Sequence, residues 1–142
     1  MNTDQLLFAG SRIVGVVFLA AAVMKAINPS NFHGHITRLG LVPRRWARLF
    51  APALIGVEGA WGAALIIAFA PTVVLPATAV ALVLLSGMSA WGVRSGRTED
   101  CGCYGGFITP SLWQSVGLNG LYFALTSIAW TAHPVSNLPP IT

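Results

Sequence analysis

Three long stretches of this chain are almost free of charged residues. Residues 50–70 hold one charged side chain, Glu58, and residues 71–93 hold none. No Asp, Glu, Lys or Arg follows Asp100, so residues 112–131 form a third such stretch. A helix needs about 20 apolar residues to cross a hydrocarbon core of ~30 Å, because each residue rises 1.5 Å. Each stretch is therefore long enough to span a membrane.

The composition excludes a water-soluble protein of this size. Of the 142 residues, 55% are hydrophobic and 8% are charged, whereas soluble domains carry ~25% charged residues. A small soluble domain has too much surface to bury so many apolar side chains. The net charge of +4 does not indicate a nucleic-acid-binding protein, because the few arginines lie in loops and form no basic face. We expect a membrane protein with no nucleic-acid partner.

A fourth apolar stretch completes the predicted fold. Residues 6–27 are apolar apart from Arg12 and Lys25, and Lys25 can extend to the headgroups from the helix end. Asp4, with no Lys or Arg before Arg12, favours a span over a cleaved signal peptide. We predict an all-α fold, a four-helix transmembrane bundle with up-down topology, in one domain over residues 1–142. Its spans are expected at residues 6–27, 50–70, 72–92 and 111–131.

Prolines mark the expected helix ends. Pro29 stops the first span and Pro71 separates the second from the third, because proline disfavours a helical conformation in the residue before it. Thr109 and Pro110 are expected as the N-cap and the first residue of the last span. The connection between the first two spans carries an amphipathic segment, which we predict to lie in the plane of the membrane interface.

The distribution of basic residues predicts the orientation in the membrane. The end with the two long connections holds Lys25, Arg38, Arg44, Arg45, Arg48, Arg94 and Arg97. The opposite end has no basic residue beyond Arg12. The positive-inside rule therefore predicts that the long connections, including the cysteine-containing one, face the cytoplasm and that both termini lie outside.

Both cysteines of the chain lie within three residues, in the segment Cys101-Gly102-Cys103. As a structural staple, a bridge across three residues contributes only about 1.6 kcal/mol before strain. Bridges between such close neighbours are strained, and strained bridges are the labile ones that exchange. Gly102 lacks a Cβ and can take up the backbone distortion. We interpret the cysteines as a redox pair and leave open which of them attacks; metal ligation and a structural role remain alternatives.

Glu58 is the one acidic residue inside a predicted span. A carboxylate within the bilayer costs a few kcal/mol unless it is protonated or paired. One interpretation is an ion pair with Lys25 or with Arg12 that fixes the register of two helices. The other is uptake and release of a proton coupled to oxidation of the thiols.

Two histidines suggest a metal-binding alternative. His33 and His35 lie in the first long connection, on the same side as Cys101 and Cys103. Two His and two Cys side chains match a tetrahedral zinc or copper(I) site. Only one residue separates the members of each pair, which is not the spacing of a zinc finger. We therefore favour interfacial histidines on an amphipathic turn over metal ligands.

Over nearly its whole length the chain resembles the MauE branch of the DoxX-like integral membrane proteins. The resemblance is carried by the four spans and by Lys25, Pro29, Phe32, Glu58 and the Cys-Gly-Cys-Tyr-Gly motif at residues 101–105, where many members have Phe at the position of Tyr104. It implies a membrane protein of methylamine utilisation that helps to mature a disulfide-rich dehydrogenase subunit alongside a thioredoxin-like partner. More distant relatives are associated with thiol and sulfur redox, including electron transfer to quinone.

This resemblance conflicts with the predicted orientation. The partner and client of the methylamine system work outside the cytoplasm, whereas the arginines place Cys101 and Cys103 inside. Three explanations remain open. The pair takes electrons from the cytoplasm, the loop reaches inward between the helices, or the charge rule assigns the wrong side.

Together these features predict a multi-pass protein of the cytoplasmic (inner) membrane that acts as a thiol–disulfide oxidoreductase. We expect catalytic roles for Cys101, Cys103 and Glu58, and supporting roles for Lys25, Arg12, Gly102 and Tyr104. The expected electron partner is a thioredoxin-like protein, a larger membrane complex or a quinone. A quinone-stacking side chain could be among Trp46, Trp61, Trp91 and Trp113, although anchoring at the membrane interface explains most of them. The alternatives are a metal-binding membrane protein and a non-catalytic accessory subunit of a membrane complex.

Overall fold

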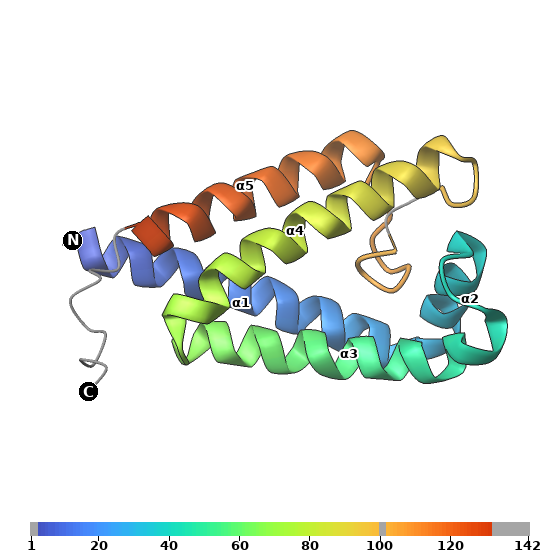
Figure 1. Ribbon diagram of the computed structural model, residues 1–142, viewed down its shortest axis with the longest axis horizontal. Helices are drawn as coiled ribbons and strands as arrows, with labels where there is room; N and C mark the ends of the chain where they lie inside the picture. The colour runs from blue at the N-terminus through green and yellow to red at the C-terminus, as the bar shows by residue number, and fades with distance from the viewer. Residues whose placement is uncertain (1–2, 100–101, 132–142) are drawn as a thin grey trace, which may run out of the picture.

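The computed structural model describes residues 3–99 and 102–131, which form five helices and contain no strand. The helices are α1 (Thr3–Ile27), α2 (Pro29–Leu39), α3 (Arg44–Ile66), α4 (Pro71–Arg94) and α5 (Leu112–Thr131). Figure 1 shows the four long helices running lengthwise beside one another, with the short α2 at one end. The all-α prediction is confirmed for the described residues.

Among the described residues, three helices are long and apolar enough to cross a membrane: Phe8–Ile27 within α1, and the whole of α3 and α4. The predicted fourth span, α5, is a helix of 20 residues without a charged side chain. It is not among the three candidate spans, and it carries polar residues, among them Gln114 and Asn119. Asn119 donates a hydrogen bond to Ser86 of α4 at 3.0 Å. The structure therefore supports a membrane protein with at least three candidate spans.

The starts of α3 and α5 differ from the prediction. α3 begins at Arg44, six residues before the expected start at residue 50, because its first turns carry arginines that the span criterion excluded. α5 begins at Leu112 instead of Pro110. Ser111 and Gln114 form a reciprocal cap there: the Gln114 amide donates to Ser111 Oγ at 3.4 Å, and the Ser111 amide donates to Gln114 Oε1 at 2.9 Å. This capping box satisfies two amide groups that the helix leaves unpaired.

The bundle is held together most closely where α1 crosses α3. A Cβ added at Gly62 would lie 2.7 Å from the carbonyl oxygen of Gly15 and 2.7 Å from the amide nitrogen of Leu19. Small residues thus let the two backbones approach, as expected for helices in a membrane. α5 packs against α4 and α1, whereas α3 and α4 pack much less extensively against each other. The sparse packing leaves room between α3 and α4.

The predicted amphipathic segment is helical, but its apolar face is covered by protein. Phe32 and Ile36 of α2 are buried against Ala47 and Ala51 of α3. Leu41, Trp46, Leu49 and Phe50, which belong to the same predicted pattern, are exposed. The segment therefore divides into a helix that packs on the bundle and a set of apolar side chains that face outward.

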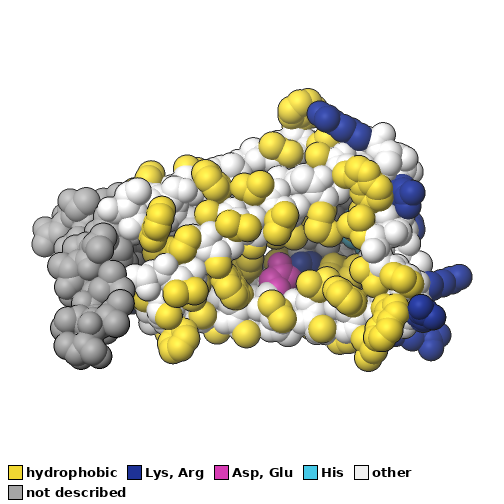
Figure 2. Space-filling model, in the orientation of Figure 1, with side chains coloured by type: hydrophobic (Ala, Val, Ile, Leu, Met, Phe, Trp, Pro, Cys, Tyr) yellow, Lys and Arg dark blue, Asp and Glu magenta, His cyan; other side chains and the backbone are white. Residues whose placement is uncertain are grey.

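Basic side chains gather at the end of the molecule that holds α2, while hydrophobic side chains cover the visible face of the long helices (Figure 2). The two long connections lie at this basic end, and the start of α1 and the end of α5 lie at the other (Figure 1). The basic residues and the two long connections therefore lie at one end of the fold, as the sequence predicted.

Candidate functional site

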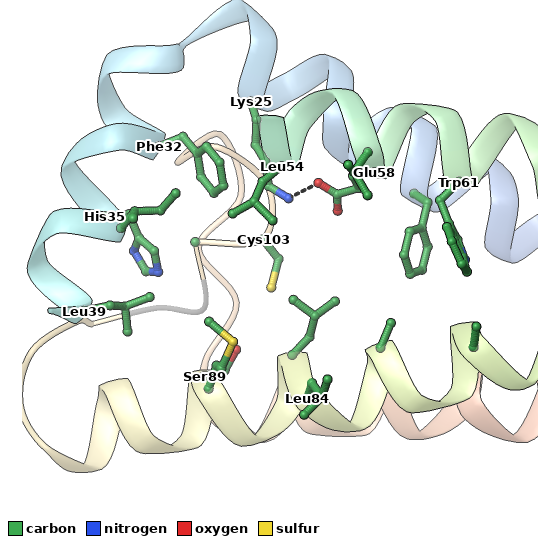
Figure 3. A pocket seen from close by; sticks show the side chains of 18 residues that line it. Lys25, Phe32, His35, Leu39, Leu54, Glu58, Trp61, Leu84, Ser89 and Cys103 are labelled. Carbon is green, nitrogen blue, oxygen red and sulfur yellow. Dashed lines mark hydrogen bonds and ion pairs between the residues drawn. The ribbon is translucent and has the colours of Figure 1, made fainter. Parts of the chain in front are cut away.

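A cavity of about 380 Å³ lies between α1, α2, α3, α4 and the connection that follows α4. Its walls are mostly apolar, and its polar lining is confined to a few side chains: Lys25, His35, Glu58, Ser89 and Cys103. Figure 3 shows these side chains facing a common space. The cavity therefore brings together residues that are up to 85 positions apart in the sequence, from Phe18 to Cys103.

The buried ion pair of the site joins α1 to α3. Lys25 Nζ donates a hydrogen bond to Glu58 Oε2, and the two side chains are only 6% and 17% exposed. Lys25 Nζ also lies 5.1 Å from the centre of the Phe32 ring, a cation–π contact. Because α3 begins at Arg44, Glu58 lies about 21 Å along that helix. Of the two partners predicted for Glu58, the structure selects Lys25.

Arg12 does not take part in this site. It is exposed on α1, about 20 Å from Lys25 along the helix at the usual rise per residue. The predicted supporting role of Arg12 through a pair with Glu58 therefore has no basis in the structure.

The connection between α4 and α5 folds inward to bring Cys103 to the cavity (Figure 1). Asn31 of α2 donates a hydrogen bond to the Gly105 carbonyl at 2.8 Å. Gly105 has a φ of 62°, and a Cβ there would lie 2.9 Å from the Met24 carbonyl oxygen. Only glycine fits this position, because the left-handed backbone and the contact with α1 both exclude a side chain.

Gly102 lies directly against His35. Its φ is 64°, and a Cβ added to it would lie 2.3 Å from the His35 ring. Cys103 follows, and Figure 3 shows its sulfur atom pointing into the cavity. Cys101 lies outside the described residues. A glycine is therefore required at this position, because any larger residue would displace His35, while the role predicted for Gly102 beside the cysteines stays a prediction.

Tyr104, in the connection before α5, is about half-buried and lies near Tyr122 of α5. Burial, followed by the neighbouring Tyr122 and Glu58, raises the pKa of Tyr104 from its ordinary value of 10 to about 12. Its hydroxyl is therefore neutral at physiological pH.

The two histidines of the metal alternative occupy different environments. His35 lines the cavity, whereas His33 Nε2 is buried without a hydrogen-bond partner. Within residues 3–99 and 102–131, no group of three or more His, Cys, Asp or Glu side chains is placed to hold a metal ion. The predicted four-ligand set also includes Cys101, which lies outside these ranges.

Sequence reasoning missed several residues of the cavity wall. Leu54 of α3 is one of them, and it lines the cavity beside Glu58 and Trp61. Their spacing of four and three residues places the three side chains on one face of α3. Trp61 Nε1 donates a hydrogen bond to the buried Thr78 hydroxyl of α4 at 2.8 Å. The helical spacing around Glu58 could have predicted which residues of α3 share its face. The residues of α4 that line the cavity could not be predicted in this way, because their position depends on how the helices pack.

The fold and the cavity define a helical membrane protein with a buried ion pair beside a cysteine-bearing loop. The family model described as "Methylamine utilisation protein MauE" matches residues 3–132, and the chain belongs to this family. It is similar to the methylamine utilization protein MauE of Paracoccus denitrificans, with 29% identity over 134 residues, which cover 93% of this chain and 72% of that protein. No solved structure matches it significantly. The resemblance inferred from the sequence is confirmed.

Proposed function

We propose that this protein is a membrane thiol–disulfide redox protein in which Cys101 and Cys103 form the exchanging pair. The observation that carries the proposal is the position of Cys103, which lines an apolar cavity together with the Lys25–Glu58 ion pair. Positive charge near a cysteine favours the thiolate, which is the reactive form, and Lys25 lines the same cavity as Cys103. We propose a disulfide-containing client, and the description of the family as methylamine utilisation proteins suggests that this client belongs to methylamine utilisation.

The exchange follows from ordinary disulfide chemistry. A thiolate of the partner attacks the Cys101–Cys103 disulfide and forms a mixed disulfide, and the second partner thiolate then displaces the remaining cysteine. The partner gains one disulfide, and the pair becomes two thiols. Lys25 stabilises the thiolate produced, and Glu58 takes up or releases the accompanying proton. A thioredoxin-like protein or a quinone restores the pair.

We further propose that α5 is the fourth span of a single domain. It has no charged residue and packs between α4 and α1, so that four helices cross in alternating directions. The basic end, with the cysteine loop, then faces the cytoplasm by the positive-inside rule. The loop that folds inward between the helices gives the pair a route to groups within the bilayer.

The test is a Cys101→Ser/Cys103→Ser double variant, assayed for disulfide exchange with a thioredoxin-like protein. The proposal predicts wild-type exchange and none in the double variant. Full function of the double variant in maturing its client would identify an accessory subunit instead. Stoichiometric zinc or copper in the purified protein, lost on changing His33 and His35 to Ala, would support the metal-binding alternative.

A further inference from the structure

We propose that the cavity receives the ring of a lipid-soluble quinone, which enters sideways from the bilayer between α3 and α4 and oxidises the cysteine pair. This inference rests on the redox function proposed above. It adds the place of binding, the route of entry and the direction of electron flow. Three observations support it: where the cavity opens, how its lining is divided, and how large it is.

The opening of the cavity lies in the lipid-facing surface of the bundle. Figure 2 shows a hollow in the hydrophobic face, between the positions of α3 and α4 in Figure 1, with an acidic side chain visible inside it. Leu54 of α3 and Leu84 and Met88 of α4 line the cavity and are exposed. In a membrane these side chains meet acyl chains. A ligand that enters here must therefore be soluble in lipid.

The lining divides into apolar walls and a small polar inner end. Phe18, Leu54, Val57, Leu84 and Leu85 are among the apolar residues. The inner end carries the Lys25–Glu58 pair, His35 and Cys103, which Figure 3 shows around one space. An ammonium has three hydrogen-bond donors, of which one serves Glu58. Such an end suits a flat apolar ring that carries carbonyl acceptors.

The size of the cavity limits what can enter it completely. Its volume of about 380 Å³ is near the lower end of the ~300–1,000 Å³ typical of ligand pockets. A single substituted ring fills such a space, while a long isoprenoid tail must remain in the lipid. The open side between α3 and α4 provides that exit for the tail.

The proposed reaction balances with the quinone as oxidant. The Cys101 and Cys103 thiols lose two protons and two electrons as one sulfur–sulfur bond forms. The quinone accepts two electrons and two protons and leaves as the hydroquinone. Glu58 and Lys25 lie where they can pass the protons from the thiols to the ring. The disulfide so formed then oxidises the client's dithiol, so that the client's electrons flow into the membrane.

The experiment uses the purified full-length protein in lipid nanodiscs with decylubiquinone as the probe. Ala81 of α4 lines the cavity, whereas the neighbouring Val80 is exposed outside it. Ala81→Phe should weaken decylubiquinone binding by about tenfold or more, and Val80→Phe should leave it within about twofold of wild type. Hydroquinone formation by the reduced protein should fall in parallel. Leu54→Trp provides a second cavity-filling variant on another helix.

The Cys101→Ser/Cys103→Ser variant separates this inference from the proposed function. It should bind decylubiquinone like the wild type and form no hydroquinone. Wild-type protein that exchanges disulfides with a thioredoxin-like protein but does not bind decylubiquinone would overturn this inference alone. Equal binding by the Ala81→Phe and Val80→Phe variants would also overturn it. Absence of thiol exchange with every acceptor would contradict the proposed function instead.

Discussion

Two single residues, Lys25 and Glu58, affect both the stability of the helix bundle and the proposed chemistry of the site. Lys25 and Glu58 are buried charges within apolar helices, and removal of one member of such a pair leaves the other uncompensated. The same two side chains border the space into which Cys103 points. If the pair only fixes the register of the two helices, replacing the carboxylate by an amide should leave redox cycling intact. If the pair also transfers protons, the same change should abolish redox cycling.

Glu58→Gln should preserve the fold, at a cost in stability because Lys25 loses its counter-charge, and it should abolish redox cycling of the cysteine pair. The amide oxygen still accepts a hydrogen bond from Lys25, whereas the side chain no longer accepts a proton. The measurements are helical circular dichroism for the fold and disulfide exchange for the cycling. Arg12→Gln is the matched control, because Arg12 is a charged residue of α1 that is exposed and remote from the cavity. Unaltered cycling in Glu58→Gln would reject a proton-transfer role.

Tyr104 should titrate at an unusually high pH in the folded protein. Its raised pKa means that, between its ordinary value of 10 and about 12, the folded protein keeps a proton that the unfolded protein releases. Folding stability should therefore fall as pH rises through this range. Ultraviolet titration of a Tyr122→Phe variant isolates Tyr104, because the chain has two tyrosines. Burial should keep the midpoint above 10, and an ordinary midpoint would show that Tyr104 is solvated.

At the scale of helices, the apolar stretches and prolines predicted the four long helices well, and their ends less well. Arg44, Arg45 and Arg48 were assigned to a connection because charge does not belong in a span, yet a helix continues beyond the membrane without penalty. At α5 the Thr109-Pro110 pattern competed with Ser111 and Gln114, and the reciprocal cap decided the start. At both helix starts the sequence contains two competing local signals, and the structure shows which of them sets the first residue of the helix.

The contact between α1 and α3 should depend on Gly62 and not on Gly56. A Cβ at Gly62 would meet the Gly15 and Leu19 backbones, whereas nothing lies within 4 Å of one at Gly56. Gly62→Ala should destabilise the protein by about 1–3 kcal/mol, the usual cost of overpacking, and Gly56→Ala should leave stability nearly unchanged. Thermal unfolding in detergent measures both. Equal stability of the two variants would contradict close backbone packing at this crossing.

The sequence pointed to the residues that are proposed to carry the chemistry of the site, but not to the cavity that joins them. The cysteine motif, Glu58 and its partner Lys25 were all identified from residue type and position. His35 reaches the site because α2 folds back on α3, and Tyr104 reaches Tyr122 because the connection folds inward. Such contacts between distant segments depend on the packing of the whole chain, which periodicity and composition do not encode.

At the scale of the whole molecule, the arrangement of charge makes a prediction about sidedness. The basic end and the cysteine loop coincide (Figures 1 and 2), so the positive-inside rule places Cys103 toward the cytoplasm. A membrane-impermeant thiol reagent should label the reduced pair in broken cells and not in intact cells. Labelling in intact cells would reverse the orientation and bring the pair to the side on which an extracytoplasmic client works.

The central claim is that Cys101 and Cys103 gain and lose two electrons reversibly, and a redox titration measures this directly. The purified protein is equilibrated in glutathione buffers of increasing oxidation, alkylated, and weighed by mass spectrometry. We expect the wild type to change reversibly from two alkylated thiols to none. The single variants Cys101→Ser and Cys103→Ser should retain one alkylated thiol in reducing buffers and lack the intramolecular transition. Two thiols that stay reduced in every buffer, or that a metal ion protects from alkylation, would contradict this claim.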